Sequence, residues 1–517
     1  MNKVLKGLVA VVSTAAMAVA GFAGAASATA AEGYTLTVNN TKTGHTYEAY
    51  QVFKGRLDNG TLSDIEWGEG VDGAALSAAK YNNKAAKDIA KDLKTTANAE
   101  AFANNVAGGN GADSYLKTAT GSVKGETNQS KEITGLSAGY YLLKDTIDSS
   151  TAEKPAAYTK FILKVVGNVD VTPKTDTPSV EKKVQENSSK YATDGGYGAG
   201  YNDVADYNIG DAVPFKLIGT VPNMDRYDTY KYTFNDTASN GLTLPSKGVM
   251  VYVAADKAGT DKVDITSFAA ITVEGQKLTV AFTDLKTVDG VTAGKYIIVE
   301  YSATLNGNAV IGLPGNENAV KLTFSNNPNQ SGQGGSNPQG ETAEDKVIVF
   351  TYQLNGTKVD ATDNNKTLEN AEFKLQRQSD SKWAQIADGK VTAWGDEANA
   401  SVVKSNANGK FSVAGLDDGK YNVKETKAPA GYDLPADPFE VTLTAQTKND
   451  QEWDGTPASA LKDHTNGQFN ETFVNNAGSN LPSTGGMGTT ILYAAGAAIV
   501  LVAAFGIAFA VRRRNAR

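Results

Sequence analysis

The sequence is poor in the side chains that most often carry chemistry. Its 517 residues include no cysteine and only two histidines, His45 and His464, which are far apart in the chain. The lack of cysteine excludes disulfides, and two distant histidines do not support a zinc site or a histidine-based triad. The glycine-rich stretch at 195–200 lies among Tyr and Asn and does not predict a phosphate-binding loop, and the acidic stretch at 360–365 is more typical of a turn than of a calcium site. We therefore expect a protein without enzymatic activity, cofactor or metal.

Basic residues are also too few and too dispersed to form a nucleic-acid surface. Lys and Arg number 49 against 57 Asp and Glu, and the net charge is −8. The 52 glycines, with many Thr, Val, Asn and Tyr, suit short strands joined by tight turns. Alternating stretches such as 277–282 and 296–301 predict a mainly β protein, whereas helical periodicity is concentrated at 74–106.

Long apolar runs occur only at the two ends of the chain. Lys3 and Lys6 precede an apolar, Ala-rich stretch with small residues after it, which predicts a secretory signal peptide over 1–30. The run at 490–511 is long enough to cross a bilayer as a helix, and the basic tail at 512–517 would stay on the cytoplasmic side. These features predict an exported protein whose precursor is held transiently in the plasma membrane.

Two breaks divide the exported part of the chain. Two prolines within seven residues favour an extended linker at 172–177, and a Gly- and Asn-rich stretch predicts a second linker at 327–343. Three domains are therefore expected, at 31–171, 178–326 and 344–478.

The C-terminal motif carries a first family resemblance. Leu481, Pro482, Ser483, Thr484 and Gly485 form an LPxTG pentapeptide ahead of the apolar run and the arginines. This order resembles the cell-wall sorting signal of Gram-positive surface proteins. The resemblance implies that a sortase cysteine attacks the Thr484 carbonyl, releases the chain from Gly485 onward, and passes the acyl group to an amine. The alternative is a membrane-anchored protein with a chance LPSTG sequence.

The first linker contains a candidate for that amine. Val169-x-Val171-Thr172-Pro173-Lys174 resembles the pilin motif of sortase-assembled pilus subunits, with Thr172 in place of the usual tyrosine. The resemblance implies that Lys174 is the acceptor of the acyl group. A lysine beside a proline on an exposed linker is accessible, as an acceptor needs to be. A merely solvated linker lysine is the alternative.

A twelve-residue match identifies the family. Residues 421–432, from Tyr421 to Tyr432, agree with the E-box pattern YxxxETxAPxGY, and 368–375 resembles an opening strand of collagen-adhesin B-type domains. With the two motifs above, the chain is identified as a member of the sortase-assembled pilus backbone subunits of Gram-positive, here actinobacterial, cells. The resemblance implies three tandem immunoglobulin-like, collagen-adhesin B-type β-sandwich domains, with a helical insertion in the first and a C-terminal transmembrane helix.

The same resemblance implies internal Lys–Asn isopeptide bonds. Such a bond forms with loss of ammonia when a buried, neutral amine lies against a carboxamide and a buried acid shuttles protons. In the C-terminal domain Lys358, Glu425 and Asn475 fit the roles of amine, acid and acceptor. Asn476 is the alternative acceptor, because one step along a strand reverses the face.

The middle domain offers a parallel set of residues. Alternation places Lys182 on the same face as its flanking valines, so Lys182 is the expected amine and Lys183 the alternative. Asp236 is the expected acid and Asn318 the expected acceptor. In the first domain Asp145 occupies a position like that of the E-box glutamate, but no lysine and asparagine can be paired there.

Three functions are compatible with these features. The favoured one is the backbone of a fimbrium, in which Thr484 of each subunit is joined to Lys174 of the next. Its implied partners are pilus-type and housekeeping sortases, identical subunits, minor tip or base pilins, peptidoglycan and a host or surface receptor. A monomeric wall-anchored adhesin is the alternative. The third function, a wall-attached hydrolase, is disfavoured because the sequence offers no catalytic constellation.

Overall fold

The protein is described here by a computed structural model. It describes residues 33–93, 95–107, 114–148, 150–152, 154, 160–173, 176–187, 200–225, 227–327, 339–445, 447, 453, 455–461 and 466–478. The predicted signal peptide (1–30), Lys174, His464, the LPSTG motif (481–485), the transmembrane segment (490–511) and the basic tail (512–517) lie outside these residues. No helix within the described ranges has both the length and the apolar character needed to span a membrane.

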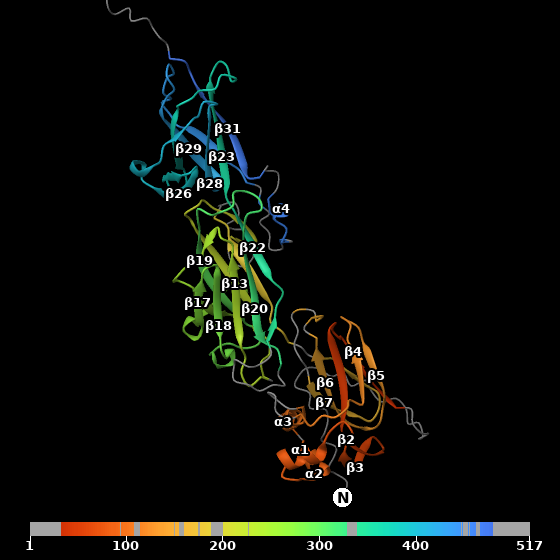
Figure 1. Cartoon of the computed structure of the whole chain (residues 1–517). Helices are drawn as coiled ribbons and strands as arrows, with labels where there is room; N and C mark the ends of the chain where they lie inside the picture. The colour runs from red at the N-terminus through yellow and green to blue at the C-terminus, as the bar shows by residue number, and fades with distance from the viewer. Residues whose placement is uncertain are drawn as a thin grey trace, which may run out of the picture.

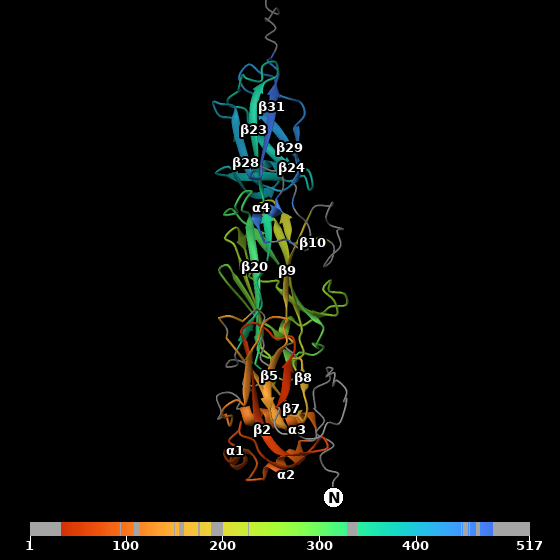
Figure 2. The same ribbon diagram turned by 90° about the vertical axis from the view of Figure 1, so that its right-hand side faces the viewer.

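The chain forms three β-rich parts that follow one another along a long axis (Figure 1). We call them the first part (33–173), the middle part (176–350) and the C-terminal part (352–478). The first part is offset to one side of the other two in Figure 1, and the three parts are nearly in line after a quarter turn (Figure 2). This arrangement confirms the prediction of a mainly β protein with several sandwich domains.

The described residues of the first part form two small sheets and three helices. One sheet has the order β5-β1-β8 and the other β3-β2-β6-β7, with β4 on β2. The strands are β1 (Tyr34–Val38), β2 (His45–Asp58), β3 (Thr61–Trp67), β4 (Gly121–Lys124), β5 (Lys131–Leu136), β6 (Gly139–Ile147), β7 (Lys160–Val165) and β8 (Val169–Val171). The helices are α1 (Gly73–Lys80), α2 (Ala86–Asp92) and α3 (Thr96–Ala107), as the helical pattern at 74–106 predicted.

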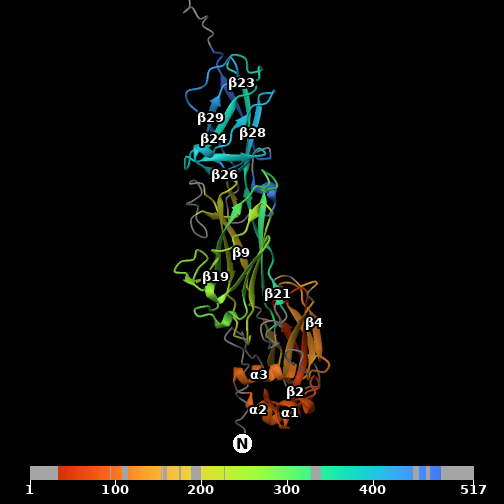
Figure 3. The same ribbon diagram turned by 60° about the vertical axis from the view of Figure 1, so that its left-hand side comes forward.

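The helices form because their apolar residues have a place to pack. Asp72 caps α1 by accepting a hydrogen bond from the Ala75 amide at 3.1 Å. Phe102 of α3 stacks on Phe53 of β2, with ring centroids 5.2 Å apart, inside a core that also buries Ile89 of α2. Figure 3 shows these helices at the end of the molecule farthest from the C-terminal part.

The middle part is a sandwich of two sheets. The first has the order β10-β9-β12-β19-β15-β16 with β14 on β19, and the second has the order β11-β22-β20-β13-β18-β17 with β21 on β20. The strands are β9 (Val180–Gln185), β10 (Tyr201–Asn202), β11 (Val204–Asp206), β12 (Ala212–Thr220), β13 (Tyr232–Ala238), β14 (Leu242–Thr243), β15 (Met250–Ala254), β16 (Val263–Asp264), β17 (Ala270–Glu274), β18 (Lys277–Phe282), β19 (Tyr296–Leu305), β20 (Asn316–Ser325), β21 (Gln339–Glu341) and β22 (Asp345–Phe350).

Strands β21 and β22 belong to the middle part, although the predicted domain boundaries place them outside it. The sequence places 339–341 in a linker and 345–350 in the third domain, but β21 and β22 both pair with β20. In the second pairing Asn316 faces Val349 and Val320 faces Asp345. The middle sandwich is therefore completed by a segment that follows the Gly- and Asn-rich stretch.

The C-terminal part is built on one long, folded sheet. Its order is β30-β29-β24-β25-β26-β28-β23-β31, with β27 on β24. The elements are β23 (Tyr352–Asp360), β24 (Glu372–Arg377), β25 (Trp383–Ala387), β26 (Lys390–Gly395), β27 (Val403–Lys404), β28 (Lys410–Leu416), β29 (Gly419–Lys427), β30 (Phe439–Leu443), α4 (Pro457–Ala460) and β31 (Gln468–Asn475). The first and last strands, β23 and β31, run side by side and parallel (Figure 2).

The middle and C-terminal parts share one hydrophobic core. At its centre the Ile209 amide donates to the Gly415 carbonyl at 3.0 Å, and the Trp394 indole donates to the Ile209 carbonyl at 3.2 Å. Gly415 has φ +88°, and a Cβ there would lie 2.6 Å from the Ile209 side chain, so glycine permits this close approach. Arg377 adds two hydrogen bonds to Asp211, at 2.9 and 2.8 Å. By comparison, an exposed ion pair between Lys154 and Glu341 links the first part to the middle part.

Ile209→Ala should destabilise the middle and C-terminal parts together. The side chain is 1% exposed, and truncating such a residue typically costs about 2–5 kcal/mol. Scanning calorimetry should show a lower thermal midpoint for both parts and an unchanged transition for the first part. Val263→Ala, at a side chain that is 60% exposed, is the matched control and should shift nothing. A shift confined to one of the two parts would contradict the shared core.

Candidate functional site

Strand alternation separates the two neighbouring lysines of β9. Lys182 points into the sandwich, where its ammonium lies 5.1 Å from the centre of the Phe215 ring. Lys183 points to the opposite face and pairs with Asp203 at 2.5 Å. Both lysines are buried, but Lys182 is the one that faces the interior of the sandwich.

Lys182 is the centre of a buried polar cluster in the middle part. Its Nζ donates to Asp236 Oδ1 at 2.7 Å and to the Tyr301 hydroxyl at 3.0 Å. Tyr301 donates in turn to Asp236 Oδ2, and Asn318 Nδ2 donates to the Tyr301 oxygen at 2.8 Å. Asp236 on β13 and Asn318 on β20 come from the sheet opposite β9, so the cluster spans the two sheets. The structure thus brings Lys182, Asp236 and Asn318 together.

Burial sets the electrostatics of this cluster. Removal from water lowers the pKa of Lys182, and the nearby Asp236 carboxylate opposes this shift. The pKa of Tyr301 is raised well above its ordinary value, by burial first and by the charge of Asp236 second. The cluster therefore favours a neutral amine and a protonated phenol, the forms required of a nucleophile and a proton donor.

The C-terminal part contains a second buried lysine centre. Lys358 of β23 donates to Glu425 Oε2 at 2.9 Å and also contacts Asn475 Oδ1. Asn475 Nδ2 donates to Glu425 Oε1 at 2.8 Å, so the glutamate of β29 contacts both the amine and the carboxamide. The side chains of Lys358 and Glu425 are fully buried. Asn475 is 2% exposed, whereas Asn476 faces solvent.

Aromatic rings enclose the second amine. The Lys358 ammonium lies 4.8 Å from the centre of the Phe439 ring and 5.7 Å from that of Phe373. Burial lowers the pKa of Lys358, and the hydrogen bond and charge of Glu425 oppose that shift. The two centres therefore share an amine destabilised in its charged form, one carboxyl group and one carboxamide.

The first part differs from the other two at the corresponding acid. Asp145 of β6 pairs with His45 of β2 at 2.8 Å, and both side chains are buried. Among the described residues of 33–173 no lysine is buried. The acid that resembles the E-box glutamate therefore pairs with an imidazole there.

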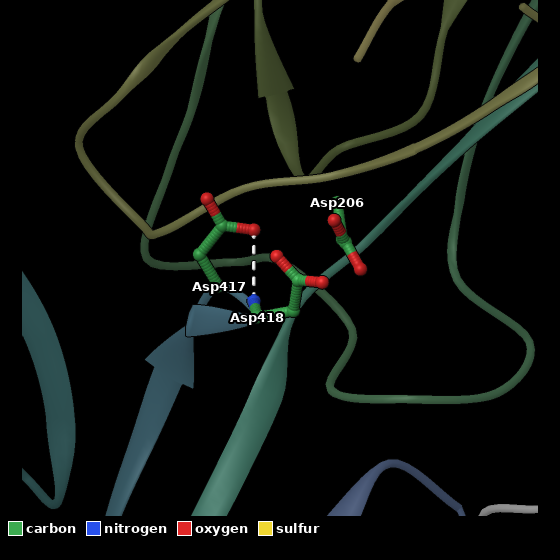
Figure 4. Close-up of side chains that lie close together, drawn as sticks. All are labelled: Asp206, Asp417 and Asp418. Carbon is green, nitrogen blue, oxygen red and sulfur yellow. Dashed lines mark hydrogen bonds between the residues drawn. The ribbon is translucent and has the colours of Figure 1, made fainter. Parts of the chain in front are cut away.

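Three aspartates meet where the C-terminal part joins the middle part (Figure 4). Carboxylate oxygens of Asp206, Asp417 and Asp418 lie within 4.8 Å of one another, and the Asp418 amide donates to Asp417 at 2.9 Å. Burial raises the pKa of both Asp206 and Asp417, so protons are retained on these groups more readily than usual. Asp206 also accepts from the Tyr352 hydroxyl at 2.6 Å. The retained protons, together with the hydrogen bonds from the Asp418 amide and the Tyr352 hydroxyl, explain how three carboxyl groups can lie close together at this junction.

The acidic stretch at 360–365 forms a turn, as its composition favoured. Asp360 accepts from the amide and hydroxyl of Thr362, at 2.8 and 2.7 Å, and from the Tyr432 hydroxyl at 2.7 Å. These hydrogen bonds lower the pKa of Asp360. Its carboxylate therefore accepts hydrogen bonds from neighbouring groups of the protein.

Tyr301 is the site residue that sequence reasoning missed. It lies on β19, where the alternating pattern indicates a strand and nothing more. Its place in the cluster follows from the register that sets Tyr301 opposite Phe215 of β12. The only available signal was that a tyrosine at an inward position needs a partner for its hydroxyl.

Three family models match segments of the chain. The Cna-B-like domain of Gram-positive pilin backbone subunit 2 matches 209–328, the prealbumin-like fold domain matches 352–457, and the LPXTG cell wall anchor motif matches 474–516. The first match includes Asp236 and Asn318 of the middle centre, and the second includes Lys358 and Glu425 of the C-terminal centre. The third match covers the predicted sorting motif.

Two curated relatives have related sequences. The chain is 27% identical over 263 residues to the trypsin-resistant surface T6 protein of Streptococcus pyogenes, a match that covers 47% of this chain and 44% of that protein. It is 25% identical over 338 residues to fimbrial subunit type 2 of Actinomyces naeslundii, a match that covers 60% of this chain and 59% of that protein. The chain therefore spans about half the length of the curated relatives it matches. Relatives occur in two bacterial groups, so an actinobacterial source stays a prediction.

A solved structure supports the fold. The T6 backbone pilin of Streptococcus pyogenes, described as a modular three-domain structure, aligns with a TM-score of 0.55 at 16% identity. The alignment covers 88% of this chain and all of that one. The pilin domain, the prealbumin-like domain and the anchor motif together make the chain similar to the LPXTG-anchored pilus backbone subunits of Gram-positive bacteria.

Proposed function

We propose that this chain is the structural subunit of a covalently polymerised pilus. A pilus-type sortase would join the Thr484 carbonyl of one subunit to Lys174 of the next, and a housekeeping sortase would attach the finished fibre to peptidoglycan. The observation that carries the proposal is the pair of buried lysine centres in two successive sandwiches of an elongated chain. A monomeric adhesin has less need of such centres, because tension is not transmitted through it to further subunits.

Each lysine centre is arranged to form an isopeptide bond. In the C-terminal part Glu425 Oε2 would take a proton from Lys358 Nζ, and the neutral amine would attack Asn475 Cγ. The new bond is Nζ–Cγ and the broken bond is Cγ–Nδ2. Glu425 Oε1 lies against Nδ2 and would return that proton to it, so the leaving group is ammonia, and Glu425 Oε2 would take the second proton that Nζ loses as the amide forms. No external acid, base or oxidant is consumed.

The two cross-links would lie on the path of tension along the fibre. Load applied at Thr484 enters β31, and the bond from Asn475 to Lys358 passes it to the parallel neighbour β23. That strand continues directly into β22 of the middle part, which pairs with β20 beside Asn318. The second bond passes load to Lys182 on β9, the strand that follows the Lys174 linker. Both ends of the path are the predicted sites of sortase joining.

Intact mass tests the internal bonds. The mature chain, residues 31–484, should be lighter than its sequence mass by two ammonia molecules, and peptide mapping should join Lys182 to Asn318 and Lys358 to Asn475. Glu425→Gln keeps the size of the acid but cannot shuttle the proton, so it should restore one ammonia mass. By analogy with disulfide loop closure, losing a link around more than a hundred residues should cost about 4–5 kcal/mol of stability.

The control for that experiment is Glu440→Gln, which changes an exposed glutamate of β30 outside the centre. It should keep both links and the wild-type thermal midpoint. A wild-type mass equal to the sequence mass would refute isopeptide formation in both parts.

Polymerisation is tested separately at Lys174. Lys174→Ala should remove the high-mass ladder from wall extracts boiled in detergent, because the acyl group then lacks its acceptor. Single subunits should still reach the wall through Thr484. Lys174→Arg should behave in the same way, since a guanidinium stays protonated.

Lys154→Ala, at an exposed lysine of the first part, is the control and should leave the ladder intact. A ladder that persists in Lys174→Ala cells would assign the acceptor to another lysine. A single band in wild-type extracts would favour the monomeric adhesin.

A further inference from the structure

In the two lysine centres, different groups contact the amine and the carboxamide. Glu425 touches the amine and the carboxamide directly, through one oxygen each, at 2.9 and 2.8 Å. Asp236 is one methylene shorter, and its two oxygens are taken by Lys182 and the Tyr301 hydroxyl. The Asn318 nitrogen, in contrast, bonds to the Tyr301 oxygen at 2.8 Å. The phenol therefore occupies the place that the second oxygen of Glu425 occupies in the other centre.

The position of this hydroxyl is fixed by packing. Tyr301 is 3% exposed, and its ring stacks on Phe215 with centroids 5.4 Å apart. Within the described part of the chain, Asn318 Oδ1 is buried without a hydrogen-bond partner, so the Tyr301 hydroxyl is the polar contact that holds the carboxamide. Burial and the charge of Asp236 raise the pKa of the phenol, which keeps its proton available for donation.

We propose that Tyr301 is a catalytic residue of the middle part, the group that hands a proton to the leaving nitrogen of Asn318. This inference rests on the proposed isopeptide chemistry and adds a fourth participant to one of the two centres. Asp236 takes a proton from Lys182 Nζ, and the amine attacks Asn318 Cγ. As Cγ–Nδ2 breaks, Tyr301 gives its proton to Nδ2 and regains one from Asp236, and Asp236 then takes the second proton that Nζ loses as the amide forms. The sum is one amide formed and one ammonia released.

The test is Tyr301→Phe in the mature chain, with intact mass followed from synthesis onward in a cell-free translation. Removing a general acid typically slows a reaction by about 10²–10⁴-fold. We therefore expect the Lys182–Asn318 link to form at least about a hundredfold more slowly, while Lys358–Asn475 forms at the wild-type rate. The C-terminal part thus acts as an internal control for folding and chemistry.

Tyr230→Phe is the matched control variant. Its hydroxyl is also buried in the middle part, but it has no hydrogen-bond partner within the described residues. This variant should form both links at the wild-type rate. A Tyr301→Phe chain that links Lys182 to Asn318 as fast as wild type would overturn the proposal.

A second variant separates proton transfer from packing. Asp236→Glu combined with Tyr301→Phe lengthens the acid by one methylene and removes the phenol oxygen, which imitates the arrangement of Glu425. It should recover the Lys182–Asn318 link, whereas a folded double variant that stays unlinked would contradict the role of Tyr301. Failure of the underlying isopeptide proposal is distinguishable, because wild type itself would then show no loss of ammonia in either part.

Discussion

The burial of a lysine inside each of two sandwiches is the constraint on which the rest of the structure depends. An isolated ammonium in an apolar core costs several kcal/mol even after relaxation, so it must be paired, neutralised or consumed. The structure surrounds each one with a carboxyl group, a carboxamide and aromatic rings. Conversion of the amine to an amide would remove the charge altogether. The feature that is unfavourable before the reaction would thus drive the chain toward its covalent form.

The surrounding fold places these centres in a mechanical sequence. The C-terminal centre ties β23 to its parallel neighbour β31, and the middle centre ties one sheet of a sandwich to the other. Between them, the shared core around Ile209 and the Arg377–Asp211 contact hold the two parts together. The first part has no buried lysine among its described residues and meets the middle part through an exposed ion pair. Stiffness is therefore expected to be greatest in the middle and C-terminal parts.

Much of this arrangement was readable in the sequence. Strand alternation selected Lys182, because local periodicity determines which face a side chain occupies. Glu425 was selected by the resemblance of residues 421–432 to a family motif. Tyr301 was missed because its role depends on the register between β12 and β19, strands far apart in the chain. The placement of β22 was missed for a similar reason. Its apolar sequence suits a buried strand in either sandwich, and only long-range pairing with β20 assigns it to the middle one.

Single-molecule pulling between Lys174 and Thr484, the two predicted sites of sortase joining, measures whether the cross-links carry the load. With both bonds in place, residues 183–317 and 359–474 lie inside closed loops and cannot lengthen under load. We expect wild type to show no unfolding step attributable to those residues, and Glu425→Gln to add one step whose length matches the C-terminal loop. Extension of the wild-type chain by the full contour length of either loop would show that the cross-link around that loop is absent.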